Sequence, residues 1–169
     1  NVNYFRITQR PVQSEIYELC DRLGLLVQTD FPAFGVMRRN TVCEAIKQAQ
    51  EMEHLIRSHP SCVMVTYINE PWFPEMVKRL RWLKRDELEK FFDCATQMIH
   101  ILNPDRVVKP VDGDYDPPSH CGLPDYHCYN CWYNGHGIDI GMMHKGYWMP
   151  VKAGWDFGCG EYGMEGLEP

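Results

Sequence analysis

The stretch Cys62-Val63-Met64-Val65-Thr66-Tyr67-Ile68-Asn69-Glu70-Pro71 decides the fold. Its first seven residues are mostly apolar, β-branched or aromatic, which is typical of a strand buried on both faces of a parallel sheet. Pro71 has no backbone N–H and biases Glu70 toward an extended conformation, so the strand ends there. We therefore expect Asn69 and Glu70 at the carboxyl end of a buried strand, the edge at which α/β folds place their chemistry. The alternative is a glutamate that only caps the next helix.

Strands and helices alternate along the rest of the chain, which predicts an α/β fold with a parallel sheet and right-handed crossovers. Both a barrel and an open sheet are compatible with this order. No Gly-x-Gly-x-x-Gly follows the first strand, which disfavours a nucleotide-binding sheet. The sequence predicts strands over residues 3–8, 25–32, 62–68, 106–112, 126–133 and 155–163, the last with Glu161 at its end. It predicts helices over 15–23, 41–59 and 85–102, a loop over 114–124 and a short helix at best over 138–148.

The composition excludes several classes of partner. The 169 residues are 44% hydrophobic and 24% charged, which is enough for one globular core. The formal net charge is −6 and there is no basic run, so neither nucleic acid nor an anionic membrane surface is an expected partner. No apolar stretch approaches the roughly 20 residues that span a bilayer.

The eight cysteines are scattered over predicted helices and strands. This scatter is typical of small buried side chains in a reducing compartment, which favours the cytoplasm over an oxidising one. Cys128 and Cys131 have Cys-x-x-Cys spacing, so a zinc or thiol-redox module is an alternative. A second such pair is lacking, and we therefore expect no metal.

Glu70 and Glu161 each end an apolar strand, about three βα units of roughly 30 residues apart. In a barrel this separation places the two strands across from each other, with both carboxylates directed into the mouth. Glycosidic bond cleavage requires two such groups: one protonated to deliver a proton to the leaving oxygen, the other ionised to attack the anomeric carbon. Burial and neighbouring charges can tune a glutamate for either role.

Four stretches together resemble the catalytic barrel of glycoside hydrolase family 2, which includes β-galactosidases, β-glucuronidases and β-mannosidases. They are Phe5-Arg-Ile-Thr-Gln-Arg-Pro11, Tyr17-Glu-Leu-Cys-Asp-Arg-Leu-Gly-Leu-Leu-Val27, the His59-Pro-Ser strand that ends in Asn69-Glu70, and Gly160-Glu-Tyr-Gly163. The resemblance implies an incomplete (β/α)8 TIM barrel: residues 1–169 form a partial catalytic domain with about strands two to seven.

Carried over by position, the resemblance makes Glu70 the general acid/base and Glu161 the nucleophile. Asn69 then binds the sugar 2-hydroxyl, Tyr129 hydrogen-bonds the nucleophile, and Arg6 holds the nucleophile ionised. A structural ion pair is the alternative for Arg6, and a place in the core is the alternative for Tyr129. Further substrate-binding candidates are Asp30, Trp132 and Trp148, and Trp72 is a possible sugar-stacking wall.

The resemblance implies a retaining β-glycosidase that hydrolyses terminal β-linked sugars without a cofactor. Gln9 stands where many family members have His, and Asp30 near a position often held by Glu, so the pocket differs from that of a standard β-galactosidase. Alternatives are a retaining endo-glycanase of the same clan, such as a mannanase or cellulase, and a non-catalytic sugar-binding barrel. We expect the segment to be inactive alone and to belong to a larger multidomain chain, for which a homo-oligomer is one possibility.

Overall fold

The computed structural model describes residues 2–73, 81–113, 115 and 117–124, all within the first of two compact units, Asn1–Asp125. Two predicted strands, over 126–133 and 155–163, and the short helix over 138–148 lie outside the described residues. The elements in chain order are β1 (Tyr4–Ile7), α1 (Ser14–Leu23), β2 (Leu26–Asp30), the 3-10 turn η1 (Arg39–Thr41), α2 (Val42–Ile56), β3 (Cys62–Thr66), β4 (Ile68–Asn69), α3 (Arg85–Leu102), β5 (Val107–Val108) and β6 (Val111–Asp112).

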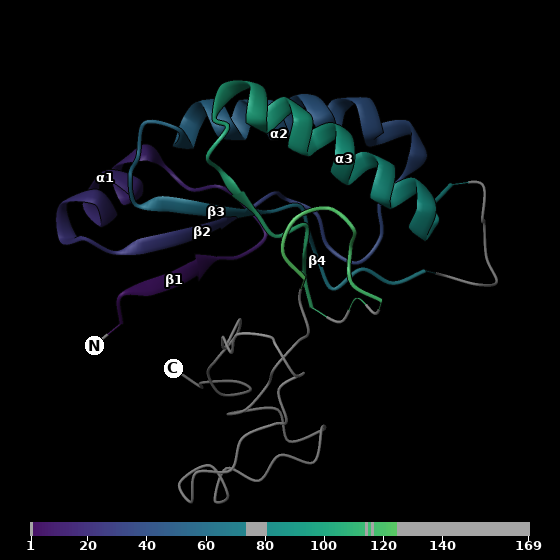
Figure 1. Cartoon of the computed structure of the whole chain (residues 1–169), viewed down its shortest axis with the longest axis horizontal. Helices are drawn as coiled ribbons and strands as arrows, with labels where there is room; N and C mark the ends of the chain where they lie inside the picture. Colours follow the sequence, from purple (N-terminus) through teal and green to yellow (C-terminus); the bar gives the residue numbers. More distant parts are fainter. Residues whose placement is uncertain (1, 74–80, 114, 116, 125–169) are drawn as a thin grey trace, which may run out of the picture. The chain divides into compact units, whose positions relative to one another are not determined.

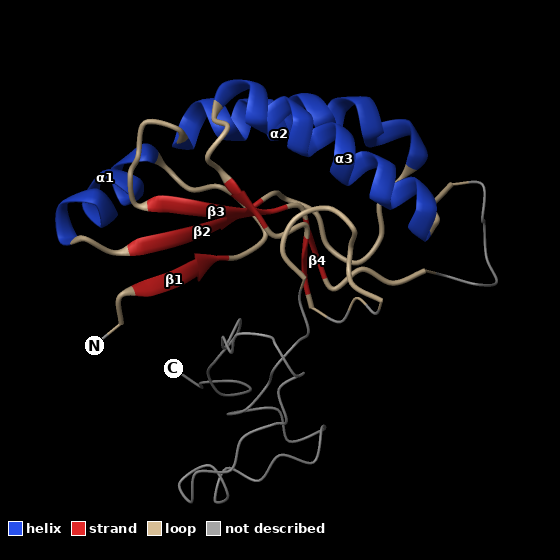
Figure 2. Cartoon of the chain, viewed as in Figure 1, coloured by secondary structure: helices blue, strands red, loops and turns tan. Residues whose placement is uncertain are grey.

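The strands form a parallel sheet in the order β1-β2-β3-β5, and the short strands β4 and β6 form a second parallel pair. Successive parallel strands need a crossover, and α1, α2 and α3 supply the crossovers between them. Figures 1 and 2 show α2 and α3 lying side by side over one face of this sheet. The predicted α/β fold with a parallel sheet is confirmed.

The core lies between α3 and the sheet and is rich in aromatic side chains. Tyr67 stacks on Phe92, with ring centroids 5.9 Å apart, and meets Phe91 edge-on at 5.8 Å. All three side chains are fully buried. Burial raises the pKa of Tyr67, whose hydroxyl lies 2.9 Å from Thr96 Oγ1. Aromatic packing of this kind holds α3 on the strands that carry the site.

Helix α1 packs on the sheet through a narrow face. Tyr17 and Cys20 are buried, whereas Ile16, Leu19 and Leu23 are 42%, 46% and 62% exposed. Gln13 is the N-cap residue, so the helix begins at Ser14, one residue before the predicted start at residue 15. Gly24 ends the helix at φ +68°, a conformation that glycine adopts without strain.

The strand predicted over 62–68 is interrupted at Tyr67, and the one predicted over 106–112 is interrupted at Lys109 and Pro110. Pro110 cannot donate a hydrogen bond, and its carbonyl accepts two of them, from the N–H groups of Tyr67 and Ile68 at 3.0 and 3.1 Å. Pairing then resumes with Ile68 opposite Val111 and Asn69 opposite Asp112. The interruption therefore sets the register that brings Asn69 next to Asp112.

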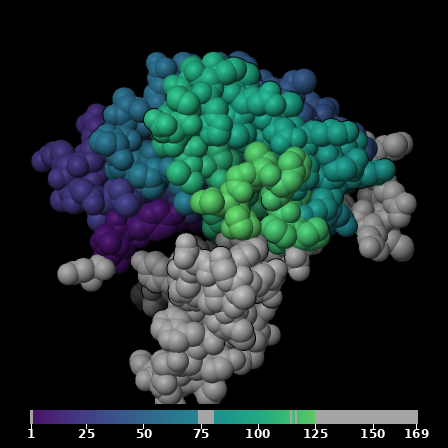
Figure 3. Space-filling model, viewed as in Figure 1, coloured from purple at the N-terminus to yellow at the C-terminus, as the bar shows by residue number. Residues whose placement is uncertain are grey.

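The segment after β6 lies against α3. Ser119 Oγ donates to Glu89 Oε2 at 2.7 Å, and His120 Nε2 lies 3.0 Å from Asp93 Oδ1. In the space-filling view, α3 in teal and the 117–124 segment in green form a continuous surface (Figure 3). The described residues 117–124 contain no helix or strand, as the sequence predicted for this loop. No helix among the described residues is long and apolar enough to cross a membrane.

Candidate active site

Asn69 and Glu70 lie at the carboxyl end of β4, as the sequence predicted. Asn69 is 1% exposed, and its backbone N–H donates to the carbonyl oxygen of Ala33 at 3.0 Å. The Asn69 carbonyl accepts the N–H of Gly35 at 2.9 Å. One neighbouring backbone segment, residues 33–35, therefore holds Asn69 at the edge of the sheet through both bonds, and Glu70, which is partly buried, follows it directly.

The backbone of Glu70 is left-handed, with φ +44°. The prediction that Pro71 keeps Glu70 extended was therefore wrong. Tertiary contacts override this local bias: the Glu70 N–H donates to the carbonyl oxygen of Asp112 at 2.7 Å, and Gly113 packs so closely on the Glu70 backbone that a Cβ there would lie 3.1 Å from Glu70 Cα. A positive φ is uncommon for a residue with a side chain, and such residues gather at functional sites.

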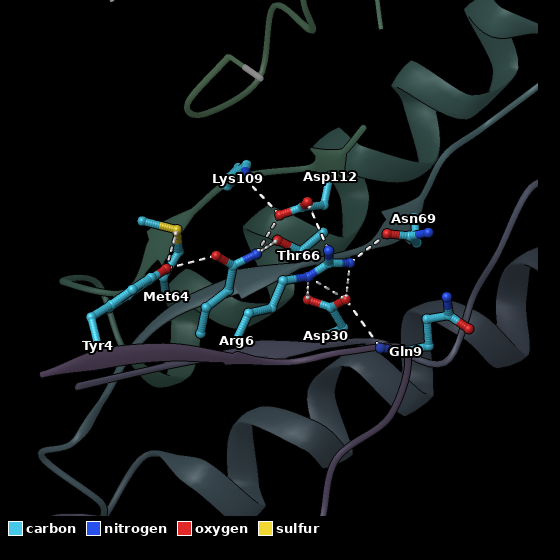
Figure 4. Close-up of polar contacts among 10 residues, drawn as sticks. Tyr4, Arg6, Gln9, Asp30, Met64, Thr66, Asn69, Lys109 and Asp112 are labelled. Carbon is cyan, nitrogen blue, oxygen red and sulfur yellow. Dashed lines mark hydrogen bonds and ion pairs between the residues drawn. The ribbon is translucent and has the colours of Figure 1, made fainter. Parts of the chain in front are cut away.

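Arg6 of β1 lies at the centre of a polar cluster that includes Asp30, Asp112 and Asn69, as Figure 4 shows. Its Nε donates to both Asp30 carboxylate oxygens at 3.1 and 2.9 Å, and its Nη2 lies 2.5 Å from Asp30 Oδ2. Its Nη1 donates to Asp112 Oδ1 at 2.8 Å, and its Nη2 donates to Asn69 Oδ1 at 2.5 Å. The guanidinium is planar, so these contacts from three strands place the Asn69 amide in one orientation.

Asp112 of β6 was not among the sequence-predicted site residues. Its Oδ2 accepts hydrogen bonds from Lys109 Nζ at 2.6 Å and from Gln28 Nε2 at 2.8 Å, while Oδ1 faces Arg6. Tyr4 extends the network by donating to Gln28 Oε1 at 2.6 Å. A polar residue that ends an apolar strand was the signal used for Glu70, and the same signal at Asp112 could have identified it.

The pKa values of the two carboxylates in this cluster, Asp30 and Asp112, shift in opposite directions. Burial raises the pKa of Asp30, and its contacts with Arg6 offset this only in part. Burial also acts to raise the pKa of Asp112, but Lys109 and Arg6 outweigh it and hold the pKa below its ordinary value. Asp112 therefore stays ionised most firmly, because it faces two cations where Asp30 faces one.

The Asn69 side chain has one satisfied and one unsatisfied end. Its Oδ1 accepts from Arg6, whereas the buried Nδ2 has no hydrogen-bond partner in the part of the chain that the structure describes. A buried amide N–H without a partner costs about 1–3 kcal/mol, so native structures rarely keep one without a use. The arrangement leaves this donor for a hydroxyl or other acceptor brought by a ligand.

The other sequence-predicted site residues divide into two groups. Arg6 and Asp30 lie together with Asn69, and their contact is the buried ion pair named as the alternative for Arg6. Outside the described residues lie Glu161, Tyr129, Trp132 and Trp148, together with the Cys128 and Cys131 of the zinc alternative. Within the described ranges, no group of three His, Cys, Asp or Glu residues could hold a metal ion.

Trp72 follows the site by two residues and is 56% exposed. Its backbone N–H donates to the Gly35 carbonyl at 2.9 Å, and its indole lies over Gly35 so closely that a Cβ there would be 2.5 Å from Nε1. The indole is exposed rather than in the core, and its role as a sugar-stacking wall stays a prediction.

The chain is similar in sequence to mammalian β-glucuronidases. It is 34% identical over 74 residues to the Beta-glucuronidase of Sus scrofa, which covers 41% of this chain. It is 28% identical over 144 residues to the Beta-glucuronidase of Canis lupus familiaris, which covers 80% of this chain. The chain spans 11% and 21% of the length of these two relatives. No model of a known protein family matches the sequence.

Solved structures show the same likeness in fold. The Parabacteroides merdae Beta-Glucuronidase aligns with 85% of this chain at a TM-score of 0.63 and 20% identity, over 18% of its own chain. Bacteroides uniformis beta-glucuronidase 2, covalently bound to cyclophellitol-6-carboxylate aziridine, aligns with 85% of this chain at 0.62 and 19% identity, over 18% of its own chain. At such identities the likeness concerns the fold alone. Together the matches confirm the predicted resemblance to glycoside hydrolase family 2, with the β-glucuronidases as its matching members.

Proposed function

We propose that this chain is a segment of the catalytic barrel of a retaining β-glycosidase. The observation that carries the proposal is the placement of Asn69 and Glu70 at the carboxyl end of a parallel sheet, above a buried cluster that orients the Asn69 amide. The four-stranded parallel sheet and its helical crossovers support the (β/α)8 barrel as the complete fold, with this segment supplying about strands two to seven.

In the proposed reaction Glu161 attacks the anomeric carbon and Glu70 protonates the leaving oxygen. Glu70 then removes a proton from water, which attacks the glycosyl-enzyme and releases the sugar with retained configuration. One structural relative, Bacteroides uniformis beta-glucuronidase 2, is covalently bound to cyclophellitol-6-carboxylate aziridine, which supports a covalent step. The scheme requires no cofactor.

Asn69 is the proposed ligand of the sugar 2-hydroxyl. Its Nδ2 is the unsatisfied donor described above, and Arg6 holds the opposite end of the same amide. Hydrogen bonds to the 2-hydroxyl strengthen as the oxocarbenium-like transition state forms, so a donor held in advance accelerates the reaction. The proposed hydrogen bond to substrate explains why the fold keeps a buried donor that has no partner among the described residues.

The proposed substrate is a terminal β-linked sugar, and a β-glucuronide is the first to test because the matched relatives are named β-glucuronidases. None of the comparisons favours the endo-glycanase or the zinc module. The proposed setting is a larger multidomain enzyme, which the partial coverage of the relatives supports. The cytoplasmic location and the oligomeric state stay predictions.

The test is a panel of aryl β-glycosides, including the glucuronide, galactoside, mannoside and glucoside, assayed with the complete polypeptide. We expect turnover of at least one member and its loss in Glu161→Ala and Glu70→Ala. Activity of Glu161→Ala within about tenfold of wild type would contradict the assignment, because removing a nucleophile costs several orders of magnitude. Retention requires a separation of roughly 5–5.5 Å between the two carboxyl groups, whereas about 6.5–9.5 Å would indicate inversion.

A further inference from the structure

Asp112, which ends the neighbouring strand β6, and Gly113, which follows it, contact the Asn69–Glu70 pair in three ways. The first is a backbone contact. The Asp112 carbonyl accepts the N–H of Glu70 at 2.7 Å, and this bond is made while Glu70 has its left-handed φ of +44°. Rotation about φ turns the Cα substituents of Glu70 and leaves its N–H in the peptide plane that follows Asn69, so this bond anchors the point from which the Glu70 side chain departs.

The second contact depends on the absence of a side chain at Gly113. A Cβ on this residue would lie 2.9 Å from Glu70 Cγ and 3.1 Å from both Glu70 Cα and Glu70 N. Two of these three atoms belong to the Glu70 backbone, so they cannot move aside without changing its conformation. Gly113 also has φ +121°, which residues with a side chain rarely adopt. The close approach therefore requires glycine for two independent reasons.

The third contact runs through the Asp112 side chain. Its Oδ1 holds Arg6 Nη1 at 2.8 Å, and the Nη2 of the same guanidinium donates to Asn69 Oδ1 at 2.5 Å. Lys109 and Gln28 hold the other carboxylate oxygen, so Asp112 cannot rotate freely. Asp112 therefore orients the Asn69 amide through one rigid, planar intermediary.

We propose that the Asp112-Gly113 dipeptide positions both residues of the Asn69–Glu70 pair, Gly113 by placing Glu70 and Asp112 by orienting Asn69. This inference rests on the proposed glycosidase function. It separates two roles, the placement of Glu70 and the orientation of Asn69. Neither residue contacts substrate in this scheme: both are positioning residues.

The first experiment compares Gly113→Ala with Gly24→Ala in the complete polypeptide. Gly24 is the matched control because it also has a positive φ, +68°, but a Cβ there would meet nothing within 4 Å. Both variants carry the strain of alanine at positive φ, and only Gly113→Ala displaces Glu70. The measurement is kcat/KM for a series of aryl β-glycosides whose leaving groups span a wide range of pKa.

A displaced general acid impairs only substrates that need protonation. We expect Gly113→Ala to lose about 100-fold on the poorest leaving groups, the loss that an error of about 1 Å in placement can cause, and to approach wild type on the most activated ones. Gly24→Ala should keep the wild-type dependence on leaving group. An equal loss on all substrates, or an unchanged dependence, would overturn the role of Gly113.

The second experiment compares Asp112→Asn with Glu53→Gln. Glu53 is the matched control because it is also a buried carboxylate with an arginine partner, at 2.9 and 3.0 Å from Arg106, but it lies on α2. The measurement is the ratio of kcat/KM for a β-glycoside to that of its 2-deoxy analogue, which reports the hydrogen bond from Asn69. Asp112→Asn also tests the proposal if Gly113→Ala fails to fold.

We expect Asp112→Asn to lower this 2-hydroxyl ratio toward that of Asn69→Ala and to change the leaving-group dependence little. Glu53→Gln should leave the ratio at its wild-type value. An unchanged ratio in a folded Asp112→Asn protein would overturn the role of Asp112. Failure of the proposed function is a different result: wild-type protein would then hydrolyse no glycoside in the series, whereas failure of this inference leaves wild-type turnover intact.

Discussion

Arg6 is the residue on which the polar cluster depends. Its side chain is 4% exposed and lies between Asp30 and Asp112, so its charge compensates two buried carboxylates at once. We expect Arg6→Met to lower the free energy of unfolding by about 3–5 kcal/mol, because removing one partner leaves uncompensated buried charge. Urea denaturation measures the change. Lys47→Met, which removes an exposed i,i+4 pair at 3.6 Å, is the control, and an equal loss there would contradict the argument.

The depressed pKa of Asp112 predicts a specific pH dependence. The carboxyl titrates at lower pH in the folded chain than the ordinary value of 3.8, so folding favours its ionised form. Its contribution to stability is complete above about pH 3.8 and is lost as pH falls through the lower folded pKa. The difference in unfolding free energy between wild type and Asp112→Asn should therefore become smaller as pH falls below about 3.8. A difference that widens on acidification would contradict the sign of the shift.

Cys62 illustrates how burial suppresses thiol chemistry. The residue is 3% exposed, and burial raises the pKa of its thiol to about 11. Only the thiolate reacts with alkylating agents, so we expect Cys62 to be modified far more slowly than the exposed Cys43 and Cys94. Mass spectrometry after iodoacetamide treatment at neutral pH gives the order of modification. Equal rates at the three positions would indicate that the strand around Cys62 opens readily.

At the scale of elements, α3 was predicted at its observed bounds, Arg85–Leu102. Its signals are local: a helical period of apolar residues, and acidic residues in the first turn. The strand predicted over 62–68 was instead split in two, because the interruption at Tyr67 comes from Pro110, which lies between β5 and β6. Local signals predict an element that is continuous by itself, and they miss a break that a neighbouring strand imposes.

The first turn of α3 supplies a testable contribution to acid stability. Glu87 accepts the backbone N–H of Lys84 at 2.8 Å and pairs with Arg39 at 2.5 Å. The hydrogen bond from Arg39 is the main cause that lowers the pKa of Glu87 to about 2. This contribution is complete above the ordinary pKa of 4.5 and is lost as pH falls toward about 2. Over that range of pH, we expect the melting temperature measured by circular dichroism to fall less steeply with decreasing pH in Glu87→Gln than in wild type. A decline identical to wild type would contradict this.

At the scale of the whole molecule, β1 and α1 present unpartnered surface among the described residues. β1 pairs only with β2 within these residues, and Ile16, Leu19 and Leu23 of α1 form an exposed apolar stripe at helical spacing. An open edge beside an apolar stripe favours association when such a segment is isolated.

We therefore expect the isolated 169-residue segment to self-associate and to show little or no glycosidase activity. Sedimentation velocity should give a concentration-dependent mass, and Leu19→Lys combined with Leu23→Lys should reduce it. The exposed position Lys47, changed to Glu, is a control for altered surface charge. A monomeric wild-type segment with full turnover would contradict the interpretation of the chain as part of a larger barrel.

The sequence by itself determined the alternation of strands and helices, the end of α1 at Gly24, and the arrival of Asn69 and Glu70 at a strand end. Each of these follows from residues close together along the chain. Only the tertiary structure decided the left-handed Glu70, the partners of Arg6, and the role of Asp112 and Gly113. The physical reason is that register across parallel strands is set by contacts such as those of Pro110, and register determines which distant residues meet.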